Sequence, residues 1–210
     1  RAISAKLDVL CFNLRFAYGD GNTKDNRIVH TNDSLFIGED FICKVAMPVM
    51  AWLAIYSREY LNINNLQFFE GIIHEDQEFT PRAYCLAERI AFCDMVVYNY
   101  LQREEGIMKS KQNTRRCKDL LTVADSLYAF TRHHLKKGTI AYDKMMEKVS
   151  FAFTQSLAYY DSKEFSVKLY CKKEYYPLQI NSSLSPKFRW KYRLVNLSIT
   201  LYLLVYKFIK

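Results

Sequence analysis

The sequence predicts an α/β fold in the first half of the chain and a mainly helical region in the second. Residues 7–14 form a short apolar run that ends at polar turn residues, as buried strands do. Residues 90–101 are rich in β-branched and aromatic side chains, which favour strands. Beyond them, apolar residues recur at helical spacing. We therefore expect a sheet with flanking helices in residues 1–112 and helices in residues 113–210.

Between the two expected strands, the chain alternates polar and apolar segments. Glycines and polar residues from Gly19 to Asp33 predict a surface loop. Residues 41–60 are almost continuously apolar and allow two interpretations. A helix can start near Pro48, or a strand can run through residues 51–56.

Three helices are expected in the second half. The first begins at Asn113 or Thr114, which are good helix caps, and ends at Lys137 in its last turn. The second spans residues 141–159, and a third surrounds residues 165–175. We assign these helices a packing role, because they carry no catalytic constellation of side chains.

The C-terminal residues 186–210 form a basic tail. Lysines and arginines alternate with aromatic residues, and an uncharged run follows before the last lysines. This run is too short to cross a bilayer. Basic residues beside Trp and Tyr suit a helix that lies in an anionic membrane interface. The alternative is a helix docked on the protein itself or on a second copy.

The net charge of +8 favours an anionic partner, such as a nucleotide diphosphate or an acidic membrane surface. Most acidic residues precede Glu105, whereas lysines and arginines dominate after it. A solvated basic surface is the alternative interpretation. Nucleic acid is not expected as a partner, because apolar stretches interrupt the basic residues.

The six cysteines lie in apolar surroundings and form no C-x-x-C pair. This pattern argues against a zinc site and against a small disulfide scaffold. Reduced, partly buried thiols in a cytosolic protein fit best. The sequence contains no signal peptide and no run of about twenty apolar residues.

Four ionisable residues gather in the stretch from Phe68 to Arg82: His74, Glu75, Asp76 and Glu78. A strand or turn is expected at residues 66–73, where Gly71 lets the chain bend. A helix is expected to follow, with Thr80 as its cap and Pro81 in its first turn.

The acidic residues then lie at or just before the N-terminus of this helix, which is expected to run to Glu88. The helix dipole favours ionised carboxylates there. A base that stays ionised near neutral pH can take a proton from a sugar hydroxyl. The alternative is that Glu75, Asp76 and Glu78 only cap the helix, as acidic residues often do.

Several short motifs follow one another in the first half of the chain: Met47-Pro48, Ala51-Trp52, Arg58–Leu61, Asn65–Phe68, Gly71–Phe79, Arg89-Ile90, Tyr98–Tyr100 and Arg103-Glu104. In these motifs the chain resembles the second half of a bacterial family 2 glycosyltransferase. That family has a Glu-Asp motif followed by a helix, a strand that ends in aromatics, and a loop of the form Arg-Glu-Gly-Ser-Ile. The resemblance implies part of a GT-A-like mixed sheet in residues 1–112.

The resemblance also implies an activity, in which a sugar passes from a nucleotide-sugar donor to an acceptor hydroxyl with inversion. Asp76 would be the general base on the acceptor, and Glu75 would orient the acceptor or the base. Trp52 would border the acceptor pocket, and a core tryptophan is the alternative. His74 is a further candidate substrate-binding residue.

The loop after residue 101 supplies two more candidates for substrate binding. Arg103 can pair with a phosphate through its planar guanidinium, and Lys109 can add a point charge. The alternative is a solvated loop in which Arg103 pairs with Glu104 or Glu105.

The chain departs from the family pattern in two places. Glu105 and Gly106 replace the usual Gly and Ser of the loop, and no Asp-x-Asp occurs anywhere in the sequence. In the family, that motif holds a divalent metal, Mn or Mg, on a nucleotide-binding half that precedes the matched region. We therefore interpret the chain as the acceptor-side half of a transferase.

The implied partners are a nucleotide-sugar donor and a glycan or lipid-linked acceptor, as in bacterial surface polysaccharide synthesis. The expected location is cytoplasmic and peripheral, on the inner face of the membrane. A glycoside hydrolase is disfavoured, because it needs two carboxylates on opposite sides of the bond, and Glu75 and Asp76 are neighbours. The second alternative is a non-catalytic module, derived from a transferase, that binds a membrane surface or a protein.

Overall fold

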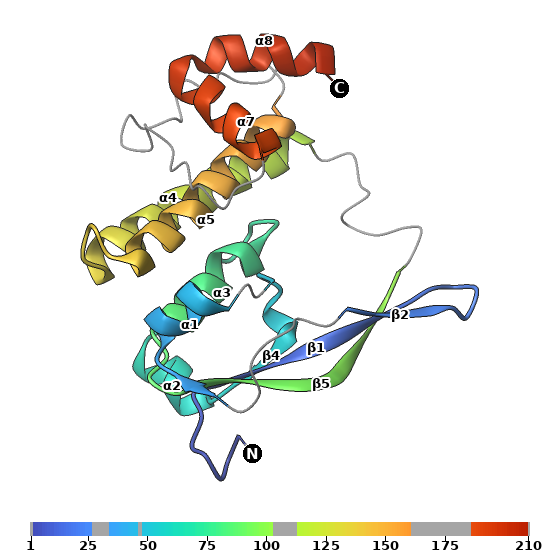
Figure 1. Cartoon of the computed structure of the whole chain (residues 1–210), viewed down its shortest axis with the longest axis vertical. Coiled ribbons are helices and arrows are strands. Elements are labelled where there is room, and N and C mark those ends of the chain that lie inside the picture. Colours follow the sequence, from blue (N-terminus) through green and yellow to red (C-terminus); the bar gives the residue numbers. More distant parts are fainter. Residues whose placement is uncertain (1, 27–33, 46–47, 103–112, 161–185, 210) are drawn as a thin grey trace. The chain divides into compact units, whose positions relative to one another are not determined.

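The computed structural model describes residues 2–26, 34–45, 48–102, 113–160 and 186–209 (Figure 1). The chain divides into two compact units. The first unit comprises Arg1–Phe69 and Phe79–Lys111, and the second comprises Glu70–Glu78 and Gln112–Lys210. The first unit contains a mixed sheet with helices and the second is helical, so the predicted α/β class is confirmed.

The first unit is built on a five-stranded mixed sheet. Its strands are β1 (Val9–Ala17), β2 (Thr23–Asn26), β3 (Leu35–Phe36), β4 (Ala54–Tyr56) and β5 (Ile90–Leu101). The strand order is β2-β1-β5-β3, and β4 pairs with β1. β1 and β5 run parallel, whereas the other pairs are antiparallel. The strand predicted at residues 90–101 is confirmed as β5, and the one predicted at residues 7–14 overlaps β1.

The loop prediction was wrong for β2, which forms a hairpin with β1. Gly21 adopts φ 84°, a left-handed conformation that lets the chain reverse tightly. Across the hairpin, the Arg15 guanidinium lies 2.6 Å from the Asp25 carboxylate. This cross-strand pair contributes to the pairing of the short polar segment with β1.

The pairing of β1 with β5 is irregular near its centre. The register shifts between Phe12 and Asn13 and again between Asn13 and Leu14. Asn13 is fully buried there, and its side-chain amide donates to the Asp94 carboxylate at 2.8 Å. A buried polar side chain needs such a partner, and the acid of β5 supplies it.

The apolar segment 41–60 contains several short elements rather than one helix. The helix α1 (Gly38–Lys44) covers its start, a 3₁₀ turn follows at Ala51–Leu53, and β4 comes next. The interpretation as a helix from Pro48 was therefore wrong, and the strand alternative is correct for β4. The helix α2 (Arg58–Ile63) then begins because Ser57 caps it, accepting the N–H of Tyr60 at 3.3 Å.

The helix α3 (Glu75–Cys85) begins earlier and ends earlier than predicted. Thr80 and Pro81 lie inside it, so the expectation that they start the helix was wrong. The first turn instead contains three acidic residues, which the helix dipole favours. Pro81 lacks an N–H and costs one helical hydrogen bond, which other contacts of this helix must offset.

The core of the first unit lies between the sheet and its helices. Val9 and Cys11 of β1 are fully buried, and they join Phe41 of α1 and Ala83 of α3 in one apolar cluster. The Tyr60 hydroxyl donates to the Ala83 carbonyl at 2.6 Å, which ties α2 to α3. This core fixes the helices against β1 and β5.

Among the residues described in the second unit are the helices α4 (Asn113–His134), α5 (Ile140–Ala158), α7 (Pro186–Leu197) and α8 (Ile199–Ile209). The helices predicted after Asn113 and at residues 141–159 are confirmed. α4 ends at His134, three residues before the predicted end, and Thr139 caps α5 by accepting the N–H of Tyr142 at 3.2 Å. The helix predicted around residues 165–175 lies outside the described residues.

The basic tail is helical, as predicted, because it forms α7 and α8. Among the residues that the structure describes, none of the helices combines the length and the apolar composition needed to cross a membrane.

At Gly38 the start of α1 packs closely against the end of α3. Its N–H donates to the Ala87 carbonyl at 2.7 Å. A Cβ at this position would overlap the backbone carbonyl oxygens of Tyr84 and Cys85 at the end of α3. Only glycine fits here, although alanine is the better helix former.

We expect Gly38→Ala to lower the free energy of unfolding by about 1–3 kcal/mol, because backbone atoms must move to admit the methyl group. Urea denaturation measures this loss. Gly19→Ala is the matched control, because a Cβ at Gly19 meets no atom within 4 Å. Equal stability of the two variants would contradict the close packing of α1 on α3.

Candidate functional site

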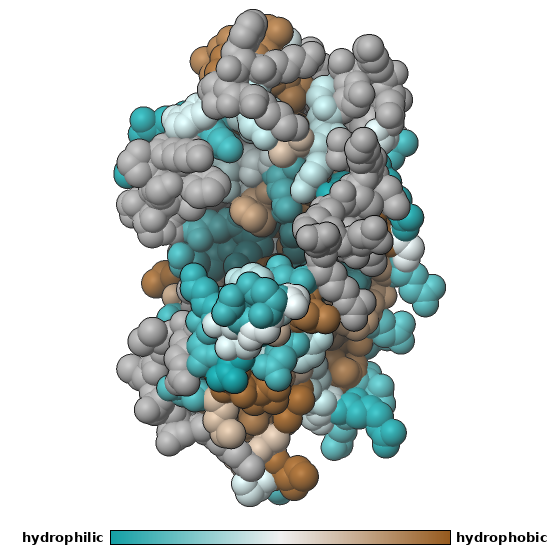
Figure 2. Space-filling view, turned by 90° about the vertical axis from the view of Figure 1, so that its right-hand side faces the viewer, coloured by the Kyte–Doolittle hydropathy of each residue, from teal (hydrophilic) through white to brown (hydrophobic). Residues whose placement is uncertain are grey.

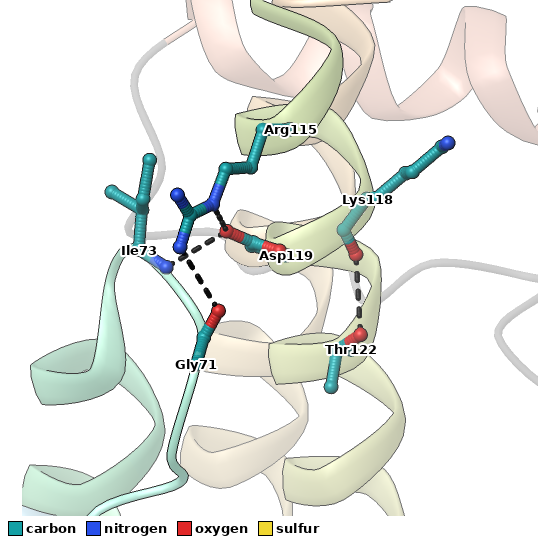
Figure 3. Close-up of polar contacts among 6 residues, drawn as sticks. All are labelled: Gly71, Ile73, Arg115, Lys118, Asp119 and Thr122. Carbon is teal, nitrogen blue, oxygen red and sulfur yellow. Dashed lines mark hydrogen bonds and ion pairs between the residues drawn. The ribbon is translucent and has the colours of Figure 1, made fainter. Parts of the chain in front are cut away.

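The segment before α3 is clamped to α4 by one carboxylate (Figure 3). The Asp119 Oδ2 atom accepts the backbone N–H of Ile73 at 2.8 Å. The Arg115 Nε atom lies 3.6 Å from the same oxygen, and its Nη2 donates to the Gly71 carbonyl at 3.1 Å. Asp119 is buried, so its contacts are shielded from water. Two side chains of α4 thus hold the backbone of this segment at two points.

The same segment contains two residues in the left-handed conformation. Gly71 has φ 79° and His74 has φ 74°. Glycine adopts this conformation without strain, whereas a residue with a Cβ pays about 1–2 kcal/mol. The bonds of Asp119 and Arg115 to the intervening backbone offset this cost. The chain therefore reverses sharply and enters α3 in a defined direction.

Two residues of the first turn of α3 pack against α4 and α5. The Ser126 hydroxyl of α4 donates to the Glu78 carboxylate at 2.6 Å, and Glu78 is only 1% exposed. The Gln77 amide donates to Gln155 of α5 at 3.2 Å. Glu78 therefore has a structural role, and these contacts help to explain why α3 starts before Pro81.

Glu75 and Asp76 are the carboxylates of this turn that keep access to solvent. Glu75 is exposed and Asp76 is half-buried. Burial raises the pKa of Asp76, and the nearby Glu75 carboxylate raises it further. Hydrogen bonds from backbone N–H groups oppose this shift in the pKa, but they are weaker. Asp76 is therefore a stronger base than an ordinary aspartate.

His74 is buried at the start of α3, with 5% of its surface exposed. Burial lowers the pKa of its imidazole, and the positive charge of Arg116 lowers it further. Within the part of the chain that the structure describes, the Nε2 atom has no hydrogen-bond partner. Burial and the charge of Arg116 thus favour the neutral form of the imidazole.

Trp52 belongs to an aromatic cluster in the first unit. Its ring lies 4.4 Å from the Tyr98 ring and 5.0 Å from the Tyr100 ring, measured between centroids. Trp52 is half-buried, whereas Tyr98 is 40% exposed. The cluster is neither a closed core nor an isolated surface ring, and its accessible faces can pack against the apolar side of a sugar.

The structure brings only some of the predicted site residues together. His74, Glu75 and Asp76 share one turn of the second unit, whereas Trp52 belongs to the first unit. Arg103 and Lys109 lie outside the described residues.

The contact between Asp119 and Ile73 could not be predicted from the sequence, because the two residues are far apart in the chain and no local pattern links them. Sequence analysis also left Tyr98 and Tyr100 without a role. Their spacing of two residues on a predicted strand was a usable signal, because such residues share a face.

A divalent metal is implied by the resemblance to the transferase family. Among the described residues, no group of three or more His, Cys, Asp or Glu side chains could hold a metal ion. Glu75 and Asp76 alone do not make such a group. The described residues therefore do not fit a metal site.

A scan of the sequence against protein-family models finds no matching family, and a search of curated proteins finds no significant match.

Removing the clamp should destabilise the second unit. We expect Asp119→Ala to lower the free energy of unfolding by about 1–3 kcal/mol, because it leaves the Ile73 N–H without its acceptor. The amide of Ile73 should also lose protection from hydrogen exchange. Urea denaturation and amide exchange followed by NMR measure the two effects.

Thr122→Ala is the matched control for Asp119→Ala. Its hydroxyl donates only to the Lys118 carbonyl of the same helix, at 3.2 Å, and reaches no part of the clamp (Figure 3). It should leave the exchange rate of Ile73 unchanged. Unchanged exchange in Asp119→Ala as well would refute the clamp.

The raised pKa of Asp76 can be tested directly. We expect Glu75→Gln to lower the pKa of Asp76, because it removes a like charge and keeps the side-chain shape. Carboxyl-carbon NMR titration measures this pKa, with Glu70→Gln in the exposed turn as control. A pKa of Asp76 that stays the same in Glu75→Gln would rule out the coupling.

The raised pKa of Asp76 also makes the stability of the fold depend on pH. The pKa of Asp76 is higher in the folded state than in the unfolded state, so the folded state binds the proton more tightly. Its contribution to stability is present below the unfolded pKa and is lost as the pH rises through the folded pKa.

Proposed function

We propose that this chain is the acceptor-side half of an inverting glycosyltransferase with a GT-A-like sheet and a nucleotide-sugar donor. The observation that carries the proposal is the turn with Glu75 and Asp76. It presents one half-buried carboxylate of raised pKa on a backbone that α4 holds in place. Together with the ordered motifs of the first half, this turn matches what a single-base transfer requires.

Asp76 accepts the proton of the acceptor hydroxyl as that oxygen attacks the anomeric carbon of the donor sugar. The new bond forms on the face opposite the departing nucleoside diphosphate, so the configuration inverts. A base works best when its pKa lies near the working pH, and burial moves Asp76 in that direction. The fixed turn keeps the carboxylate aimed while the substrate binds.

Glu75 acts beside the base. Its carboxylate is exposed and can accept hydrogen bonds from other hydroxyls of the acceptor. Its charge also keeps Asp76 basic. Two adjacent carboxylates on one helical turn cannot flank a glycosidic bond, so the same arrangement disfavours hydrolysis by paired acids.

We propose that the aromatic cluster of the first unit, Trp52 with Tyr98 and Tyr100, binds a sugar on its own accessible faces. Aromatic faces bind the apolar face of a pyranose, and Tyr hydroxyls add hydrogen bonds at its edge. We propose a glycan or lipid-linked acceptor in bacterial surface polysaccharide synthesis, with the protein on the cytoplasmic side of the membrane.

The reaction also requires side chains that bind the nucleotide-sugar donor. We propose that a nucleotide-binding half, carrying a metal-binding Asp-x-Asp, precedes this chain. A metal bound in that half would supply the positive charge that a leaving diphosphate needs. Arg103 and Lys109 remain candidates for contacts with the diphosphate.

Asp76→Asn should reduce sugar transfer about 10²- to 10⁴-fold in a longer protein that continues upstream of Arg1, because the base is lost. The free energy of unfolding should not fall, since the substitution removes a half-buried charge. Glu70→Gln, in the exposed turn before the site, should transfer at the normal rate. Transfer by Asp76→Asn at a rate close to that of Glu70→Gln would contradict the role of Asp76.

A measurement of nucleotide binding tests the proposed transferase function independently of the role of Asp76. We expect calorimetry to detect binding of uridine or guanosine diphosphate, with manganese, only by the longer protein. If neither protein binds a diphosphate, the proposal of a transferase fails, whatever Asp76 does.

A further inference from the structure

The two C-terminal helices are anchored through one side of each. Tyr192 and Val195 of α7 and Tyr202 of α8 are nearly fully buried, at 3%, 1% and 1% exposure. The ammonium group of Lys191 lies 5.6 Å from the centre of the Tyr206 ring, a cation–π contact that links α7 to α8. The described parts of α7 and α8 therefore have a defined buried side.

The other side carries exposed leucines. Leu197, Leu201 and Leu204 are 76%, 41% and 53% exposed. Leu201 and Leu204 lie three residues apart on α8, which is the spacing of one helical face, and Leu197 is the last residue of α7. These three residues are the leucine row. Figure 2 shows hydrophobic residues, in brown, at the top, where Figure 1 places α8. Single exposed leucines are ordinary, whereas exposed leucines that are close together in the chain offer an apolar surface to a partner.

The charge around these leucines has one sign. Residues 186–210 contain six lysines and arginines and no aspartate or glutamate. Arg193 is exposed, and Arg189 and Lys191 are half-buried. An apolar row beside cations is complementary to a surface with negative head groups over an apolar interior.

We propose that the exposed face of α7 and α8 binds the surface of a bilayer that contains anionic lipids. The leucines enter the boundary between head groups and acyl chains, and the cations contact the lipid phosphates. Trp190 lies among these cations, as aromatic residues do at membrane interfaces. The helices lie on the bilayer and do not cross it: eleven residues of α8 span about 16 Å, and a hydrocarbon core is about 30 Å thick.

A second copy of the chain is the competing occupant. Pairing the leucine rows of two copies around a two-fold axis brings the same cations of both tails together. No acid within residues 186–210 could neutralise them. Like charges at short range oppose such a pair, whereas anionic lipid attracts the same cations. The charge pattern therefore favours the bilayer.

The test is co-sedimentation of the full chain with vesicles. Wild-type protein should bind vesicles of phosphatidylcholine with 30% phosphatidylglycerol, and it should not bind pure phosphatidylcholine. The double variant Leu201→Glu, Leu204→Glu should bind at least about tenfold more weakly, because it removes the apolar row and adds charges that the lipid repels. Ile63→Glu is the matched control, since Ile63 is 76% exposed in the first unit.

The cations are tested separately. Arg193→Ala should weaken binding to the anionic vesicles about fivefold, and raised salt should weaken wild-type binding in the same direction. Lys137→Ala removes an exposed cation beyond the end of α4 and should leave binding unchanged. Circular dichroism checks that the variants keep their helix content.

Three results would overturn the proposal: no binding of wild-type protein to anionic vesicles, equal binding by the double leucine variant, or equal loss in Ile63→Glu. Light scattering distinguishes the competing occupant. A dimer that the double leucine variant dissociates, without vesicle binding, assigns the face to a second copy. None of these results depends on sugar transfer. The proposal of membrane binding and the proposal of transferase activity are therefore tested independently.

Discussion

The bond from the Ile73 N–H to the Asp119 carboxylate is the contact on which the candidate site depends. It stabilises the reversal between Gly71 and His74, and that reversal sets the direction in which α3 begins. The start of α3 in turn decides which carboxylates are buried and which remain accessible. The hydrogen bond thus helps to hold the turn in which Asp76 is half-buried, and this burial raises the pKa of Asp76.

Local sequence patterns predicted the long regular elements well. β5 was found at its observed bounds because twelve residues with β-branched and aromatic side chains give a clear signal. α4 and α5 followed from long helical periodicity and good caps. The start of α3 could not be predicted, because Thr80 and Pro81 are a strong local start signal. Side-chain contacts of Gln77 and Glu78 with distant helices override that signal.

The candidate site shows the same division between local and distant information. The neighbouring acids Glu75 and Asp76 were visible in the sequence, and the half-burial that raises the pKa of Asp76 was not. Trp52 was expected near an acceptor, but its contacts with Tyr98 and Tyr100 depend on the fold. Contacts between residues that are far apart in the chain leave no periodic pattern in the sequence, so only the folded structure reveals them.

The register shift around Asn13 changes which face of the sheet the side chains of β5 point to. Before the shift, Phe12 pairs with Cys93, and after it, Phe16 pairs with Tyr100. β5 thus carries three more residues than β1 across the irregularity, and an odd number exchanges the two faces of a strand. The exchange turns Tyr98 and Tyr100 toward Phe16 and Trp52. The aromatic cluster therefore depends on the number of residues that β5 carries across the irregularity. A substitution in this part of β5 should be tolerated better than the insertion or deletion of one residue.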